Sequence, residues 1–403
     1  MDAREPAAIG ERLRRLRLER GLTQEGLAGR SGISVDLIKK LEQSQRASAR
    51  LTTLVKLSRA LDVPLSELTD RRPRLNGGGG DDGLVLGLRD ALLSTDLLTG
   101  AVPGLDPADD GEPTPLPLLD AAVDRAWGDY WAGRFVELAR ALPGLIGEAR
   151  VTHRAHGAAA VRPLAQAYQL AAALLVHLGR DDLAAIGAEP AITAAATGDD
   201  EMLWATTHGT CSWALISQAR HGDAERVAIR AAERIEPRFS TAPMEHLTVW
   251  GGLVLWAMAA AVEDARPADA RGYIALSRVG AARMEHDRHD YQVNFGPTQV
   301  VMQATYAHAV AGDPDRALSA ARDVHREDLF TISYGRHLLD VAQAHTDTRH
   351  EDTAVEVLQE ACGLAPVWFR HQPVARALVA GIRERKARPS AALRELVEAL
   401  GPA

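Results

Sequence analysis

The stretch LTQEGLAGRSGISVDLIKKLEQSQR, residues 22–46, decides the fold of the N-terminal part of this chain. Thr23 and Ser34 each stand just before a short apolar segment, where a hydroxyl side chain caps the free N–H groups that begin a helix. Gly32 lies between the two segments, and a glycine there favours a tight turn. The stretch therefore predicts two short helices joined by a turn.

Further short helices are expected on both sides of this pair. Ile9, Leu13 and Leu16 recur with the spacing of an amphipathic first helix. A fourth helix is expected at about 50–61, and Pro64 then opens a last short turn. The N-terminal part of the chain thus reads as five short helices.

The helix that follows Ser34 has two different faces. Its aliphatic side chains gather on one side of a 100° wheel, and the other side carries two ammonium groups, an amide and a carboxylate. These polar residues are Asp36, Lys39, Lys40 and Gln43. Lys39 and Lys40 are two of only four lysines in the chain, so their place side by side on one short helix needs an explanation.

Charge and aromatic residues are unevenly distributed. Residues 1–75 carry 16 Lys+Arg against 10 Asp+Glu, a net charge of +6, whereas the whole chain has −8 and the remainder therefore −14. All 18 Phe, Trp and Tyr residues lie between Trp127 and Phe369. A basic domain that lacks aromatic rings for stacking on unpaired bases favours duplex DNA over single strands or RNA.

A change of composition separates two regions. Residues 71–83, RRPRLNGGGGDDG, contain four consecutive glycines, which favour a flexible tether. A short apolar helix is expected at 84–93, and a loop rich in Pro, Gly and Asp follows it. Together with the glycine-rich stretch, this helix and loop form a linker at 73–117. This linker divides an N-terminal domain at 1–72 from a larger region at 118–403.

The larger region repeats a helical hairpin. Small turns recur in the segments WAGRFVELA, HLGRDDLAA, RHGDAERVA and VAGDPDRAL. Gly133, Gly179 and Gly222 are spaced by 46 and 43 residues, and Gly312 follows 90 residues later. Such a period predicts an α-solenoid, in which each hairpin buries its apolar face against its neighbours. The expected fold class is therefore all-α throughout.

The N-terminal domain resembles the lambda repressor/Cro-like (XRE) helix-turn-helix family. The matching residues are Thr23-Gln24, Leu27-Ala28, Gly32-Ile33-Ser34, Ile38 and Leu41-Glu42. The resemblance implies that the helix after Ser34 lies in the major groove of an operator. Two residues depart from the family pattern: Ser44 stands where a glycine is usual, and Ala49 where a proline is usual.

The resemblance also implies a set of DNA-binding residues. Val35, Asp36 and Lys40 would face base edges. Lysine can donate a hydrogen bond to guanine and aspartate can accept one from cytosine, so these contacts would suit a G·C-containing half-site. The full set, with the caps, the bracing Gln24 and the phosphate contacts, is Thr23, Gln24, Ser34, Val35, Asp36, Lys39, Lys40, Gln43, Gln45 and Arg46. The alternative is a solvated helix face with an i, i+4 ion pair, which the five-helix pattern and the basic charge disfavour.

The larger region resembles tetratricopeptide repeats. The segment WGDYWAGRFVELARALP has an aromatic residue, Gly133, Phe135, Ala139 and Pro143 in the order of that family, although the spacing exceeds the roughly 34 residues of a standard repeat. The domain order resembles peptide-pheromone-responsive regulators of Gram-positive bacteria and XRE–TPR regulators of actinobacterial genomes. This resemblance implies a homodimer on an inverted repeat and a peptide or small-molecule effector.

Polar residues among the aromatic ones are the candidates for an effector site on the concave face of the solenoid. They are Tyr168, Gln169, His208, Trp250, Asn294, Gln299, Gln303, Arg336 and Asp340. Asn294 precedes Gly296-Pro297, where we expect a helix to begin. The alternatives are that the aromatic rings only fill hairpin cores and that Asn294 only satisfies a loop.

Other chemistry has little support in the sequence. The histidine-rich segments EHDRHD and HTDTRHED lack the spacing of a zinc site, and no catalytic motif occurs, so we expect neither a metal, a cofactor nor an enzyme. Two cysteines, a charged N-terminus and no expected bilayer-spanning run indicate the cytoplasm. Two rival functions stay open: a constitutive regulator whose solenoid serves only dimerisation and protein contacts, and an interaction scaffold without DNA binding.

Overall fold

A computed structural model describes residues 9–46, 49, 51–69, 80–93, 111–386 and 388–401 of the protein. Within these residues the structure is helical apart from one short hairpin, so the all-α prediction is confirmed. The five predicted N-terminal helices, here called the head, are α1 Ile9–Glu19, α2 Gln24–Ser31, α3 Val35–Glu42, α4 Leu51–Ala60 and α5 Leu65–Thr69.

Local capping explains where the central helices of the head begin. Thr23 Oγ1 accepts a hydrogen bond from Gly26 N at 2.9 Å, and Ser34 Oγ accepts one from Leu37 N at 3.3 Å. Gly32 ends α2 in the left-handed region at φ 66°. Both caps and the turn were predicted, because each depends on a side chain within three residues of the helix start.

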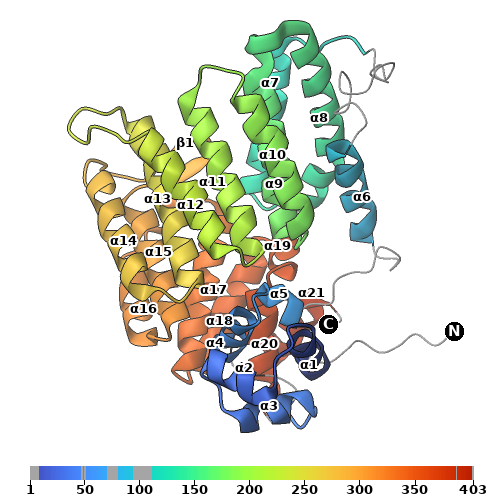
Figure 1. Ribbon diagram of the computed structural model, residues 1–403, viewed down its shortest axis with the longest axis vertical. Helices are drawn as coiled ribbons and strands as arrows, with labels where there is room; N and C mark the ends of the chain where they lie inside the picture. Colours follow the sequence, from blue (N-terminus) through green and yellow to red (C-terminus); the bar gives the residue numbers. More distant parts are fainter. Residues whose placement is uncertain are drawn as a thin grey trace, which may run out of the picture.

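The rest of the chain, here called the body, is a succession of antiparallel helices (Figure 1). Its elements are α6 Gly80–Leu92, α7 Leu116–Trp131, α8 Phe135–His156, α9 Val161–His177, α10 Asp181–Ala195, α11 Glu201–Ser217, α12 His221–Arg234, α13 Met244–Glu263, α14 Pro267–Ala281, β1 Arg288–Asp290, β2 Val293–Phe295, α15 Pro297–Ala311, α16 Pro314–Ala321, α17 Thr331–Asp347, α18 Glu351–Leu364, α19 Pro366–Arg370, α20 Pro373–Arg385 and α21 Ala391–Leu400. The predicted solenoid is confirmed, and its assignment to tetratricopeptide repeats stays a prediction.

The domain boundaries also stay predictions. The predicted linker at 73–117 falls largely on 70–79 and 94–110, which lie outside the described residues. The helix expected at 84–93 begins earlier, because α6 starts at Gly80 and ends at Leu92.

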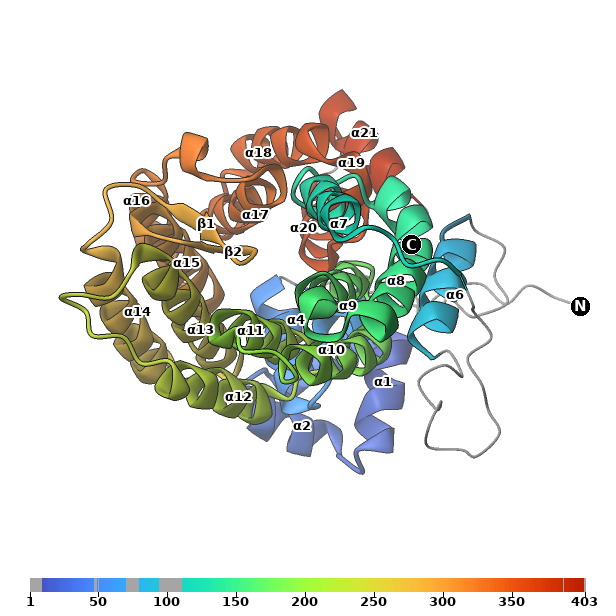
Figure 2. The same ribbon diagram turned by 90° about the horizontal axis from the view of Figure 1, so that it is seen from above.

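The body curves until its first helices meet its last ones (Figure 2). The α7 helix contacts α17, and α8 contacts α19. The turn between α7 and α8 lies at this meeting point, where Gly133 has φ 75°. A Cβ atom on Gly133 would lie 2.8 Å from the Ala365 side chain and 3.2 Å from Ile332. The backbone therefore approaches the other end of the body as closely as a glycine permits.

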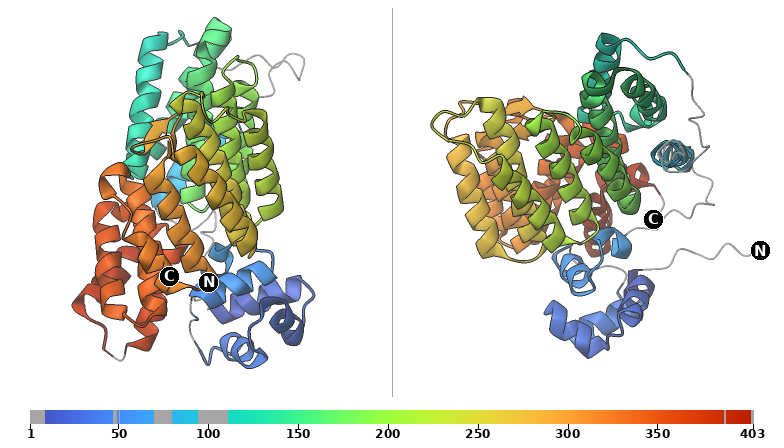
Figure 3. Two further views of the ribbon diagram at one scale, coloured as in Figure 1. Left: turned by 90° about the vertical axis from the view of Figure 1, so that its left-hand side faces the viewer. Right: turned by 45° about the horizontal axis from the view of Figure 1, so that its top comes forward.

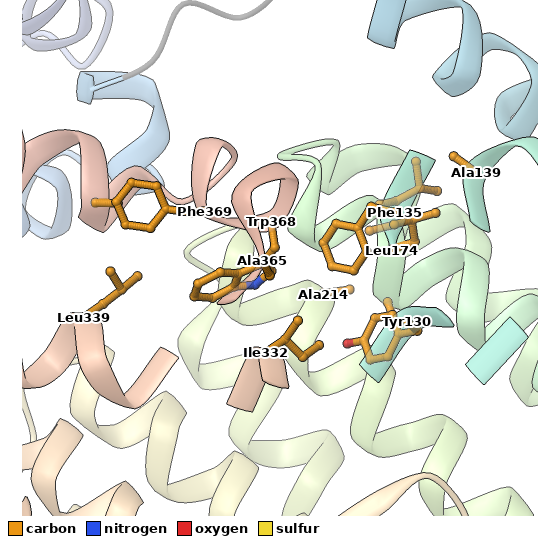
Figure 4. Packing of buried hydrophobic residues seen from close by; sticks show 14 of the residues in the cluster. Tyr130, Phe135, Ala139, Leu174, Ala214, Ile332, Leu339, Ala365, Trp368 and Phe369 are labelled. Atoms are coloured by element: carbon orange, nitrogen blue, oxygen red, sulfur yellow. The ribbon is translucent and has the colours of Figure 1, made fainter. Parts of the chain in front are cut away.

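Large side chains fill the same meeting point (Figure 4). Tyr130 of α7 stacks on Phe135 of α8 with ring centroids 6.0 Å apart. Trp368 of α19 is 1% exposed and packs with Ala365 and Ile332. Burial of aromatic side chains contributes strongly to stability, so this cluster closes the body around its centre.

The hairpin β1–β2 was not predicted. Its strands pair antiparallel, and its turn consists of Tyr291 at φ 51° and Gln292 at φ 63°. Sequence patterns for such turns rely on Gly or Asn at these two positions, and neither is present. Phe295 anchors the hairpin, because it is fully buried where a Cβ atom on Gly251 would lie only 2.2 Å from its ring.

Two stretches of the body are apolar and long enough to cross a membrane, which the sequence analysis had overlooked. They lie in Phe135–His177 and Met244–Glu263, and 83% of each apolar window is buried inside the fold. Both therefore serve as core helices of the solenoid.

The head packs against the body through α4 and α5, which contact α20. Arg59 of α4 reaches α13, where its Nη2 donates a 2.7 Å hydrogen bond to the Val262 carbonyl oxygen and lies 3.6 Å from Glu263 Oε2. The expected tether falls largely outside the described residues, and within them a hydrogen bond between residues 203 apart in the chain links the head to the body.

Replacing Gly133 with alanine should weaken the body. The substitution adds a side chain at positive φ and also overlaps Ala365, so we expect it to reduce the free energy of unfolding by about 2–4 kcal/mol. Gly179→Ala is the matched control, because Gly179 has φ 66° but open space around it, and it should cost about 1–2 kcal/mol. Urea titration followed by circular dichroism measures both, and equal losses would show that closure of the body adds nothing.

Candidate nucleic-acid interface and ligand channel

The α3 helix lies on the side of the head away from the body (Figures 1 and 3), and its polar face is exposed to solvent. Asp36, Lys39, Lys40 and Gln43 are all exposed, whereas Ile38 and Leu41 on the opposite face are fully buried. The head meets the body through α4 and α5, so docking leaves this face open.

Weak ion pairs engage both lysines. Lys40 Nζ lies 2.7 Å from Asp36 Oδ2, and Lys39 Nζ lies 3.9 Å from Glu25 Oε1. All four side chains are about half exposed or more, and such surface pairs contribute little to stability. The ammonium groups are therefore free to exchange these partners for phosphates or base edges.

A buried charge network fixes α3 within the head, and the sequence analysis missed its main pair. Arg17 of α1 donates two hydrogen bonds to the Glu42 carboxylate, at 2.7 and 2.9 Å. Gln24 Nε2 donates a third at 2.7 Å. The Arg17 and Glu42 side chains are only 9% and 3% exposed, so three helices are joined at the end of α3.

The network changes the acidity of Glu42. Burial alone would raise the pKa of Glu42, but the hydrogen bonds from Arg17 and Gln24 outweigh it and hold the pKa below its usual value. A carboxylate with a lowered folded-state pKa stabilises the fold at neutral pH, and this contribution is lost as the pH falls through that value.

The other proposed DNA-binding residues surround α3. Thr23 and Ser34 are exposed, and their hydroxyl oxygens are engaged as helix caps. Val35 is half-buried, and Gln45 Nε2 donates to Gln43 Oε1 at 3.0 Å. Arg46 is exposed in the turn that follows. Ser44 in this turn has φ 56°, the left-handed conformation for which the family usually has glycine.

The body contains a cavity of about 220 Å³ at its centre and a second of about 370 Å³ that reaches the head. Six of the nine proposed effector residues line one or both: Gln169, Asn294, Gln299, Gln303, Arg336 and Asp340. Three others line neither cavity. Tyr168 accepts a 2.6 Å hydrogen bond from Arg150, His208 stacks on Trp204 at 4.0 Å, and Trp250 packs edge-on against Phe239 at 5.0 Å.

The central cavity has aromatic walls. Trp127 and Trp131 of α7 are stacked with centroids 6.3 Å apart, and Trp213 of α11 stacks on Trp256 of α13 at 5.4 Å. His177 meets Trp213 edge-on at 4.9 Å. Sequence reasoning did not include His177 or Trp256, because their direction depends on how neighbouring hairpins pack.

The β1–β2 hairpin supplies part of the same wall. Gln292, Val293 and Asn294 line the central cavity. Gln292 Oε1 accepts a 3.2 Å hydrogen bond from Trp131 Nε1, and Asn294 Oδ1 lies 2.7 Å from His289 Nδ1. The side-chain oxygen of Asn294 is therefore already paired within the hairpin.

The cavity that reaches the head contains charged side chains. Arg336 Nη2 lies 3.2 Å from Asp340 Oδ1. Burial raises the pKa of Asp340 to about 6, although the Arg336 guanidinium opposes this rise. Tyr306 donates a hydrogen bond to Glu263, which also faces Arg59 of the head. The side chains of this cavity thus connect the interior of the body to the contact that holds the head. The two cavities together are called the channel below.

Among the described residues, no group of three or more His, Cys, Asp or Glu is placed to hold a metal ion. The free cysteines Cys211 and Cys362 are half-buried, and burial raises the pKa of both thiols.

Comparison with known proteins gives matches that centre on the head. The sequence pattern of the helix-turn-helix family matches residues 13–68. The uncharacterized HTH-type transcriptional regulator y4dJ of Sinorhizobium fredii (strain NBRC 101917 / NGR234) is 41% identical over 68 residues, which cover 16% of this chain and 87% of that protein. The 56 positions of the family match include α2, the turn and α3.

A solved structure is similar over a longer part of the chain. The crystal structure of Bacillus thuringiensis PlcR in complex with the peptide PapR7 and DNA matches 69% of this chain and 98% of that chain. The identity is 13% and the TM-score 0.27.

Removing the Glu42 carboxylate should destabilise the head. Glu42→Ala leaves the Arg17 guanidinium buried without its partner, which costs about 3–5 kcal/mol. Glu25→Ala is the control, because its pair with Lys39 is exposed and long, and it should cost less than about 1 kcal/mol. Thermal unfolding followed by circular dichroism compares them. Similar melting temperatures for the two variants would contradict a structural role for the network.

Proposed function

Because the chain belongs to the helix-turn-helix family of transcriptional regulators, we propose that α3 reads a specific operator in duplex DNA. The observation that carries this proposal is the exposed polar face of α3 within the family-matched residues. Lys40 and Asp36 would reach base edges, whereas Lys39, Gln43, Gln45 and Arg46 would contact phosphates or the groove edge. The net charge of +6 on residues 1–75 would supply the attraction to the backbone.

The two kinds of contact should respond differently to substitution. The operator is first identified by sequencing genomic fragments that copurify with the protein. Lys40→Ala should then weaken operator binding by about 1–3 kcal/mol and relax the preference at one base pair. Arg46→Ala should weaken operator and random DNA by the same factor and lower the salt dependence by about one phosphate contact. If Lys40→Ala weakened both DNAs equally, its assignment to a base edge would be wrong.

We propose further that the regulator binds as a homodimer to an inverted repeat. One α3 helix covers only a half-site, and two half-sites are usually about 34–36 Å apart, one turn of DNA. The body would hold the two chains together, because the polar face of α3 is needed for DNA.

The oligomeric state of the full chain tests this proposal. Light scattering at micromolar concentration should give the mass of two chains, and the complex with an inverted repeat should contain two chains per duplex. A duplex with a single half-site serves as the control and should bind much more weakly, since the second head then loses its base contacts. A monomer that saturates one half-site would overturn the proposal.

We also propose that the body senses an effector in its channel. Support comes from the two cavities, from polar side chains with unpaired acceptors in their lining, and from Arg59, which links the head to α13 beside that lining. We propose no catalytic activity, and we expect the protein to act in the cytoplasm, where its DNA lies.

A further inference from the structure

We propose that the effector is a small, flat, neutral aromatic molecule that carries an N–H donor, and that it binds between the tryptophans of the central cavity. This inference rests on the proposed effector role and specifies its ligand. Its basis is the combination of stacked indole walls with two buried acceptor oxygens that have no partner.

The volume of the cavities favours a small molecule over a peptide. The central cavity holds about 220 Å³, less than the roughly 300–1,000 Å³ of sites for drug-sized ligands. A molecule of two or three fused rings fits this space, whereas several residues of peptide main chain do not.

Two glutamines supply the acceptors. Gln169 is 3% exposed and Gln299 is 7% exposed, and Oε1 of each has no hydrogen-bond partner. Gln169 Nε2 donates to the Thr206 carbonyl oxygen at 3.3 Å and to Thr210 Oγ1 at 3.0 Å. These two hydrogen bonds fix the orientation of the Gln169 amide and leave its oxygen without a donor. A ligand N–H would remove the cost of an unpaired buried acceptor, about 1–3 kcal/mol for each.

The charges of the lining favour a neutral ligand. Burial lowers the pKa of His177 to about 3, so its ring is neutral at pH 7. The pairing of Arg336 with Asp340 leaves little net charge to hold a charged ligand of either sign. Rings that stack on tryptophan need no charge, since offset stacking and burial of apolar area supply the attraction.

The two cavities share lining residues, which continue the site toward the head. The shared side chains include His177, Trp213, Trp256, Met302, Gln303 and Arg336. Arg336 lies over the Tyr306 ring at 5.2 Å, and Tyr306 donates to Glu263, the partner of Arg59. A ligand that displaces Arg336 would therefore disturb the contact that orients the head.

A matched pair of probes tests the donor requirement on the full chain without DNA. Norharmane, a flat three-ring indole with one N–H, is compared with its 9-methyl derivative by fluorescence titration at pH 9, where the pyridine nitrogen of each probe is unprotonated and both molecules are neutral. Because one hydrogen bond to a buried acceptor is lost on methylation, norharmane should bind at least about tenfold more tightly. Equal affinities, or no binding of either probe up to millimolar concentration, would overturn the proposal.

Substitutions then locate the acceptor. Gln169→Leu and Gln299→Leu remove the two oxygens, and the preference for norharmane should disappear in at least one of them. Gln166→Leu is the control, because Gln166 is buried on the same helix as Gln169 but lines neither cavity. A preference that persists in both cavity variants would overturn the assignment. If a variant does not fold, the comparison of the two probes on the unaltered chain still decides.

The same probe separates this inference from the proposed function. Norharmane that binds in the channel but leaves operator affinity unchanged would support the ligand class and contradict the effector role. Operator binding that depends on Lys40, without any binding of the probe, would keep the DNA-binding function and reject the ligand proposed here. A response to an added peptide with no response to norharmane would likewise reject it.

Discussion

Closure of the body on itself is the constraint on which the rest of the structure depends. An open solenoid buries each hairpin only against its neighbours, but here the turn at Gly133 packs on Ala365 and Ile332 from the other end of the body. The meeting requires a residue without a side chain and with a left-handed backbone, and glycine satisfies both conditions. Because the ends meet, the inner faces of the hairpins surround a channel instead of lining an open groove. The enclosed tryptophans and glutamines follow from this geometry.

Closure also determines where the head can dock. The last helices return to the side where the channel opens, and α20 offers a surface to α4 and α5. The head therefore lies across one end of the channel, with Arg59 against α13 and with α3 on the side away from the body. The head thus has two separate surfaces, one formed by α4 and α5 and the other by α3. The surface that contacts the body and the surface proposed for DNA do not overlap, so docking of the head leaves α3 accessible.

The sequence predicts the local features of this structure better than the distant ones. The caps at Thr23 and Ser34 depend on neighbours within three residues, and the amphipathic faces depend on helical periodicity. The pair Arg17–Glu42 joins residues 25 apart, and neither residue type alone indicates burial. Gln169 and Gln299, which were proposed because they lie among aromatic residues, both line the central cavity, whereas Tyr168 beside Gln169 turns to Arg150. A helix wheel gives the direction of a side chain, and only the packing of other hairpins decides what lies there.

The chemistry of the contact between head and body bears on how a regulator of this shape works. Apolar side chains of the head and of the body belong to one buried hydrophobic cluster. Beside it, a guanidinium, a carboxylate and a phenol meet at Arg59, Glu263 and Tyr306. Charged groups that are partly removed from water repay the cost of desolvation only in good geometry. A displacement of about one ångström therefore changes the energy of such a contact more than it changes that of an apolar one. In the proposed effector role, a ligand beside Tyr306 would alter this charged contact and, through it, the position of α3.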